Sequence, residues 1–188
     1  MCTPDKRPSS EASRTMWLDC AGGVTSAKML AAIERVLPHG RSWADVQCFI
    51  SSSRARQQAT AVFEVLARAE AETHEVALDE VHFHEVGRLE NLARVLGIFA
   101  ALEMLGIEQW YASPPPLGNG TITCSHGELS VPAPATRRII EAYGIPSTPV
   151  PESPIVGELT TPTGVALLTQ AKGFLTEPLE AFLIAVTK

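Results

Sequence analysis

Short strand-like runs alternate with helix-forming segments along the sequence, and this alternation limits the possible fold more than any other feature. Residues 16–20 are mostly apolar and suit a strand. A turn at Gly22 and Gly23 follows, and apolar residues recur at helical spacing from 25 to 37. Residues 55–76 contain strong helix formers with one apolar face. This pattern favours an α/β fold, with a layered sheet and flanking helices in a single compact domain.

The remaining elements follow from the same signals. Leucines and a phenylalanine recur at helical spacing from residue 89 to 99, and Gly106 closes that helix. Pro134 and Pro162 each stand at the first position of a predicted helix, the second of which covers 163–172. Further strands are predicted at 81–85, 109–112, 121–124, 128–131 and 182–186. Residues 1–14 are polar and rich in proline and serine, so we expect a disordered tail before a domain at 15–188.

Charge and apolar pattern exclude several classes of protein. The net charge of −6, the sequence pI of about 5.4 and the scattered basic residues argue against nucleic-acid binding. No apolar run is long enough to cross a bilayer, and the polar N-terminus lacks the apolar centre of a signal peptide. We therefore expect a cytoplasmic protein without a membrane partner. The four cysteines are widely spaced without a C-x-x-C pair, which suggests neither a disulfide framework nor a four-cysteine zinc site.

Two histidines and a glutamate are grouped at residues 82–85. On an extended segment His82 and His84 point to one face, while the apolar residues between and before them point to the other. Imidazole suits nickel, zinc and iron, and Glu85 adds a carboxylate ligand or a general base. The pattern predicts a divalent metal site at His82, His84 and Glu85, with His84 and Glu85 also as acid/base residues. A solvated surface cluster is the alternative reading.

A threonine-rich segment precedes the last predicted helix. The hydroxyls of Thr160, Thr161 and Thr163, together with the backbone at Gly164, suit binding of a phosphate or carboxylate at a helix start. Ordinary capping by Thr161 explains part of the pattern equally well. Arg137 could pair with the same anion through its guanidinium fork, or simply face water.

His126 is a third acid/base candidate. It stands between Ser125 and Gly127 in a predicted loop, where ligands and bases are often placed. A solvated loop histidine is the other interpretation.

Several of these segments, in the same order, resemble the LarC-type nickel-insertion family. The match runs from about residue 55 to 168 and includes motifs at 67–72, 81–87, 111–114, 116–118, 126–127, 131–136 and 157–164. That family inserts nickel into a pyridinium bisthiocarboxylic acid mononucleotide and consumes CTP. The resemblance implies nickel or another divalent transition metal, and a small anionic or nucleotide-like ligand. It favours the functional interpretation of the histidine cluster and of the threonine segment.

The chain also departs from the family pattern. Ala27 stands where the family has an aspartate, and Glu90 and Arg94 stand where it usually has two aspartates. A long family stretch between residues 37 and 40 is shortened here. The resemblance covers only the N-terminal half of the family and does not extend to its C-terminal nucleotide-binding domain. Use of CTP by this chain is therefore doubtful, and a separate C-terminal-half polypeptide is the partner that the resemblance suggests.

Three functions are compatible with this sequence. The first is a nickel chelatase or cyclometallase-like protein. The second is a lyase or cyclase of a specialised biosynthetic pathway, which reuses the scaffold for His/Glu acid/base chemistry on a small anionic substrate. The third is a non-catalytic partner subunit. Any of them is compatible with a homo-oligomer.

Overall fold

A parallel sheet forms one layer of the protein in the computed structural model, which describes residues 15–37, 47, 51–124, 127–150, 154–177 and, for their backbone, 182–185. Its four strands run in the order β7, β2, β1, β8. Met16 of β1 pairs with Trp110 on one side and Phe182 on the other. The strands are β1 (Thr15–Asp19), β2 (Gln109–Ala112), β7 (Gly173–Phe174) and β8 (Phe182–Ala185). The strands expected at 16–20, 109–112 and 182–186 are thereby confirmed.

The helices follow the predicted order, with α1 (Ser26–Glu34), α3 (Ser53–His74), α4 (Leu89–Met104), α5 (Pro134–Tyr143) and α6 (Pro162–Leu168). Side-chain caps begin α1 and α3: Thr25 accepts from the Lys28 N–H at 3.1 Å, and Ser52 from the Ala55 N–H at 2.9 Å. The prolines at the starts of α5 and α6 occupy the expected first turns. The last helix ends at Leu168 and is therefore shorter than the predicted range of 163–172.

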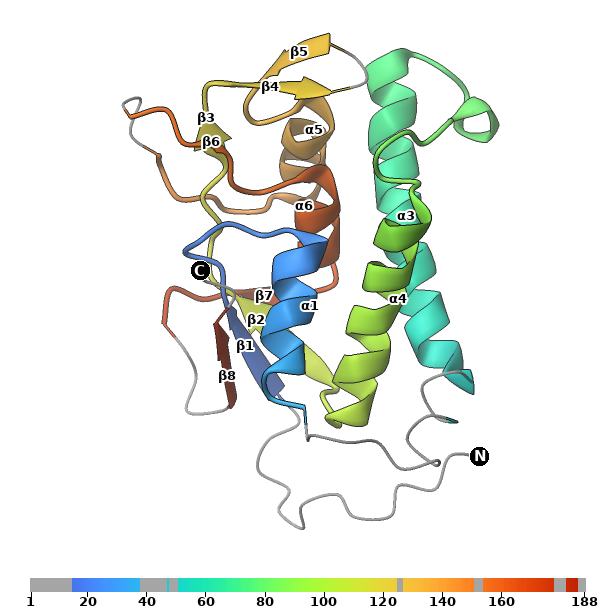
Figure 1. The fold of residues 1–188 in the computed structure, drawn as a ribbon, viewed down its shortest axis with the longest axis vertical. Helices are drawn as coiled ribbons and strands as arrows, with labels where there is room; N and C mark the ends of the chain where they lie inside the picture. The colour runs from blue at the N-terminus through green and yellow to red at the C-terminus, as the bar shows by residue number, and fades with distance from the viewer. Residues whose placement is uncertain are drawn as a thin grey trace.

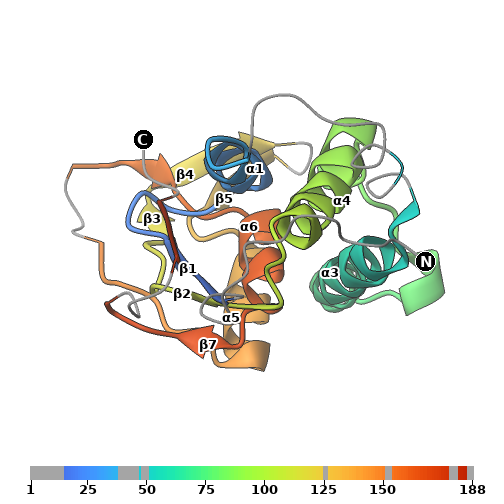
Figure 2. The ribbon, with the colours of Figure 1, turned by 90° about the horizontal axis from the view of Figure 1, so that it is seen from below.

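The helices form a second and a third layer over the sheet. Figures 1 and 2 show α1, α4 and α6 beside the sheet, with α3 beyond α4. Apolar side chains of β1, α4 and α6 meet between these layers and have almost no solvent exposure, including Met16, Leu18, Ile98, Phe99, Leu167 and Leu168. This arrangement confirms the α/β fold with flanking helices. No helix among the described residues is long and apolar enough to cross a membrane.

Two small antiparallel ribbons lie at the end of the helices away from the main sheet (Figure 1). One pairs β3 (Gly118–Asn119) with β6 (Gly157–Glu158), and the other pairs β4 (Thr121–Cys124) with β5 (Gly127–Ser130). The second ribbon confirms the strand pair predicted around His126. That histidine itself, like the tail at 1–14, lies outside the described residues.

The strand predicted at 81–85 is wrong. Within the described part of the chain these residues pair with no strand, and a short 3-10 helix, η1 (Leu78–Glu80), precedes them. Their alternation has another cause. Phe83 packs edge-on against Phe63 of α3, with ring centroids 6.2 Å apart, while His82 and His84 are exposed. The alternation therefore reflects side chains that pack on a helix alternating with exposed ones. It does not reflect pairing in a β-sheet.

Candidate functional site

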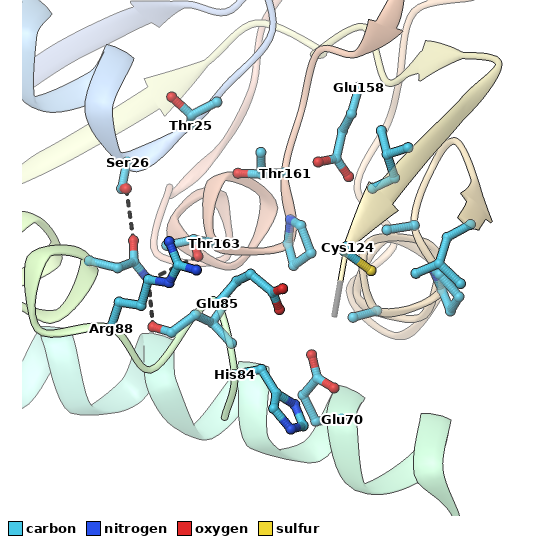
Figure 3. A pocket seen from close by; sticks show the side chains of 18 of the residues that line it. Thr25, Ser26, Glu70, His84, Glu85, Arg88, Cys124, Glu158, Thr161 and Thr163 are labelled. Atoms are coloured by element: carbon cyan, nitrogen blue, oxygen red, sulfur yellow. Dashed lines mark hydrogen bonds between the residues drawn. The ribbon is translucent and has the colours of Figure 1, made fainter. Parts of the chain in front are cut away.

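A cleft of about 480 Å³ lies between α1 and α6 on one side, α3 and the start of α4 on another, and the β4–β5 ribbon with α5 on a third. Segments far apart in sequence meet here. Figure 3 shows Glu158 and Thr161 across the cleft from His84 and Glu70. The cleft is lined by Thr25, Ser26, Ala27, Glu70, Thr73, His74, His84, Glu85, Val86, Arg88, Glu90, Asn91, Arg94, Ile122, Cys124, Leu129, Ala133, Pro134, Ala135, Glu158, Thr161, Pro162 and Thr163.

The segment that contains the histidine motif supplies part of one wall. His84 and Glu85 line the cleft, whereas His82 is exposed and does not. Among the described residues, no group of three or more His, Cys, Asp and Glu side chains is arranged to hold a metal ion. The metal site predicted at His82, His84 and Glu85 is therefore not preformed, and its binding of metal stays a prediction.

The charged residues after this motif include one ion pair and one unpaired cation. Glu90 accepts a hydrogen bond from Arg94 one helical turn later, and both side chains border the cleft. Arg88, just before α4, also lines the cleft, and no described residue forms an ion pair or hydrogen bond with its guanidinium. Arg88 can therefore bind an anion without losing a protein partner.

A buried amide holds the two sides of the cleft together. The Ser26 hydroxyl donates to Asn91 Oδ1 at 2.8 Å, and Asn91 Nδ2 donates to the Val86 carbonyl at 2.8 Å and to Thr163 Oγ1 at 3.2 Å. The amide thus joins α1, α6 and the turn that carries His84 and Glu85. Sequence reasoning missed Asn91, although an asparagine within the apolar pattern of α4 was a signal, because a buried amide needs partners.

The threonine segment is mainly an architectural junction. Thr160 is fully buried, and its hydroxyl donates to the Pro116 carbonyl at 2.7 Å and accepts from the Val24 N–H at 3.0 Å. Thr161 caps α6 by accepting from the Gly164 N–H at 3.2 Å. A Cβ at Gly164 would lie 1.9 Å from the Val24 carbonyl oxygen, so only glycine fits here.

The structure separates the residues of the predicted anion site. Thr161 and Thr163 line the cleft, whereas Thr160 is enclosed by protein and Arg137 is exposed outside the lining of the cleft. Its neighbour Arg138 pairs with Glu72 at 3.6 Å. Anion binding by this segment stays a prediction, and the geometry limits it to the two cleft-lining threonines.

Glu158 is the second residue that sequence reasoning missed. It lies inside the threonine motif, on β6, and its carboxyl group lines the cleft. Its Oε1 is buried and has no hydrogen-bond partner among the described residues. Burial raises the pKa of this carboxyl to about 7, although a hydrogen bond from the Ala133 backbone opposes the shift. A glutamate in a motif otherwise made of threonine, glycine and proline was the available signal.

Two of the cysteines, Cys20 and Cys124, differ in environment, and only the second of these two lines the cleft. Cys20 follows β1 and is fully buried, and desolvation raises the pKa of its thiol to about 12. Cys124 ends β4 and lines the cleft. The first is therefore an inert core residue, whereas the second faces any bound ligand.

The family model described as "Nickel insertion protein" matches residues 16–185. Three relatives are named as candidate nickel insertion proteins. The one from Thermomicrobium roseum is 39% identical over 157 residues, which are 81% of this chain and 38% of the relative. The one from Myxococcus xanthus is 43% identical over 136 residues, which are 70% of this chain and 33% of the relative. The one from Dictyoglomus thermophilum is 44% identical over 126 residues, which are 67% of this chain and 31% of the relative.

The matched region is therefore less than two fifths of the length of these relatives. No solved structure matches the chain.

Proposed function

This chain belongs to the nickel insertion protein family, and on that premise we propose that its cleft binds a small anionic, nucleotide-like ligand together with the nickel ion to be inserted into it. One observation carries the proposal. The segments at 81–87, 131–136 and 157–164, which are distant in sequence and carry the family resemblance, all contribute residues to the same cleft.

The two kinds of wall suit a flat ring with charged substituents. Ile122, Leu129 and Pro134 form an apolar side that can cover a ring face, and Arg88 lies among the polar residues of the α4 side. A carboxylate or phosphate that reaches Arg88 gains a charge-assisted hydrogen bond. A pyridinium bisthiocarboxylic acid mononucleotide has all of these groups.

Nickel would reach the ligand by way of His84 and Glu85. An incomplete protein site is consistent with transfer, because the sulfur donors of the ligand can complete the coordination that two protein side chains begin. His82, which lies two residues before His84 and is exposed, can bind the same ion before it enters the cleft. In this scheme nickel is a substrate and not a resident cofactor.

Calorimetry tests the metal-binding half of the proposal. Titration of the protein with NiCl₂ should show binding that His82→Ala with His84→Ala abolishes. Glu80→Gln, an exposed carboxylate two residues upstream that does not line the cleft, is the matched control and should bind as the parent does. Equal affinity in the double variant would reject this site.

The region of the relatives that this chain does not match is expected to supply the CTP-dependent part of their reaction, wherever it is encoded, whereas nickel binding and loss of the ring proton are assigned to the cleft of this chain. We expect use of CTP to depend on that region. Steady CTP turnover by the 188-residue chain would contradict this expectation.

A second candidate function is acid/base chemistry on a different small anionic substrate. The observation in its favour is that the three residues that stand where the family has aspartates, Ala27, Glu90 and Arg94, all line the cleft. Ala27→Asp with Arg94→Asp would bring the family's carboxylates back. If the parent does not bind nickel and this double variant does, the scaffold has been adapted to another reaction. Nickel binding by the parent alone favours the first function.

A further inference from the structure

Among the residues that the structure describes, Glu158 has a carboxyl oxygen buried at the cleft without a hydrogen-bond partner. We propose that Glu158 is the acid/base residue of the cleft, with Oε1 accepting a proton from the bound ligand during metal insertion. This inference rests on the proposed function. It adds a catalytic residue that lies across the cleft from His84 and that neither the histidine motif nor the family match assigns (Figure 3).

The backbone on both sides of Glu158 is fixed, so the carboxyl group has a defined direction. Glu158 pairs with Gly118 in the β3–β6 ladder, and the next N–H, from Leu159, donates to the Leu117 carbonyl at 3.1 Å. A Cβ at Gly118 would lie 2.0 Å from the Gly157 carbonyl oxygen, so the two strands can approach only because Gly118 has no side chain. Thr160, two residues later, is anchored by its two hydrogen bonds.

The two functions of the carboxyl group can be separated. The Ala133 N–H, just before α5, donates a hydrogen bond to the carboxyl group and so orients it. Oε1 is buried at the wall of the cleft without a partner among the described residues. An oxygen in this position can receive a proton only from a ligand or a water molecule in the cleft.

Two other carboxylates of the cleft already have basic side chains as partners. Glu70 lies 3.3 Å from His74, and Glu90 pairs with Arg94. None of the described residues forms an ion pair with Glu158, and burial raises the pKa of its carboxyl to about 7, where a group can both accept and release a proton. The environment of Glu158 is thus suited to proton transfer in a way that those of Glu70 and Glu90 are not.

Insertion of the metal ion at a ring carbon requires neither an oxidant nor a reductant. When a metal ion bonds to a ring carbon, the C–H bond breaks, its electron pair forms the carbon–metal bond, and the proton must leave. The Glu158 carboxylate accepts that proton at Oε1 and becomes a neutral acid. Solvent then removes the proton and regenerates the carboxylate.

A purely structural role for Glu158, as an acceptor that orients the start of α5, is the alternative. Glu158→Gln distinguishes the two, because its amide oxygen can still accept from Ala133 but cannot take up a proton at neutral pH. Glu128→Gln, an exposed carboxylate on the neighbouring ribbon outside the lining of the cleft, is the matched control.

The experiment uses the whole 188-residue chain with NiCl₂ and the pyridinium bisthiocarboxylic acid mononucleotide. Proton NMR in D₂O follows loss of the ring hydrogens, and calorimetry measures binding of the same mononucleotide. We expect the parent and Glu128→Gln to lose ring hydrogen. Glu158→Gln should bind the mononucleotide with unchanged Kd. Its rate of loss of ring hydrogen should be lower than that of the parent by a factor of about 100 or more.

Three results would overturn the inference. One is loss of ring hydrogen in Glu158→Gln at the rate of the parent. Another is that Glu158→Gln binds the mononucleotide more weakly and loses rate only in proportion. That result would mean that Glu158 only orients the start of α5. The third is binding of the mononucleotide by the parent without any loss of ring hydrogen, which leaves the proposed ligand intact. Failure of the parent to bind the mononucleotide would instead reject the proposed function together with this inference.

Discussion

The two motif segments of this chain, 82–85 and 160–164, lie close to the same cleft but differ in how firmly the fold holds them. His82, His84 and Glu85 are exposed, and their backbone forms no ladder with any described strand. Thr160 and Gly164 are buried and are joined by hydrogen bonds or close packing to Val24 and Pro116. The exposed motif at 82–85 is thus available for chemistry, whereas the buried motif at 160–164 mainly supports the fold. The degree of burial distinguishes these two roles.

The largest effect on stability is expected at Gly164. Gly164→Ala would force a Cβ to within 1.9 Å of the Val24 carbonyl oxygen, and backbone on both sides has to move. We expect a loss of at least about 3 kcal/mol in the free energy of unfolding, measured by urea denaturation. Gly97→Ala on α4 is the control, since its Cβ would meet only Leu30 Cδ1 at 3.8 Å and should cost little. Equal stabilities of the two variants would contradict an architectural role for 160–164.

Thr160→Val should have the next largest effect. It removes the hydroxyl but keeps the shape, so the Pro116 carbonyl and the Val24 N–H lose their buried partner. The expected cost is about 2–4 kcal/mol in the same denaturation experiment. Thr60→Val, on the exposed face of α3, loses only a hydrogen bond to the Arg56 carbonyl and should change stability by less than about 0.5 kcal/mol. Equal free energies of unfolding of the two valine variants would show that the buried hydrogen bonds of Thr160 do not stabilise the fold.

Glu158 should give stability a pH dependence. Its pKa is about 7 in the folded protein and near 4.5 when unfolded, so the folded state holds the proton more tightly. Stability contributed by this group is therefore complete below pH 4.5 and is lost as pH rises through 7. Glu158→Gln should be more stable than the parent at pH 8 by roughly 1–2 kcal/mol, a figure reduced because the group is partly solvated. The difference should vanish near pH 4.5. Thermal melts across this range that run parallel for both proteins would contradict the raised pKa.

The smallest effect is expected at the histidines. His82→Ala and His84→Ala should each change the free energy of unfolding by less than about 0.5 kcal/mol, because both side chains are exposed. Chemical denaturation without added metal measures this directly. A loss above about 1 kcal/mol would show that the segment 82–85, like 160–164, supports the fold.

Periodicity predicted the helices well because it records burial along a local segment. Of the four apolar residues that predicted α4, Phe99 is fully buried and Leu96 is partly buried. The first two leucines of α4 are not buried: Leu89 is 80% exposed and Leu92 38% exposed, since α4 begins at the rim of the cleft. The same local signal misled at 81–85, where packing against Phe63 produced a strand-like alternation.

The candidate site was less accessible to sequence reasoning, because it depends on contacts between distant segments. His84, Glu85, Thr161 and Thr163 were predicted and do line the cleft. Glu158 and Asn91 acquire their properties only from tertiary neighbours, such as the Ala133 backbone and the Ser26 hydroxyl. The local sequence marks both residues as unusual for their segments, but it does not identify these neighbours.

The strand order of the main sheet has a consequence for synthesis of the chain. β1 is translated before the other described strands, yet it occupies the middle of the sheet, and both of its neighbours come later, at residues 109–112 and 182–185. At typical translation rates the apolar side chains Met16 and Leu18 remain without their final partners for several seconds or more. Pairings this distant in sequence also give the sheet a high contact order, which slows folding. The nascent chain is therefore most prone to aggregation in the interval before β2 emerges, and α1 is the first element that can shield β1 during that time.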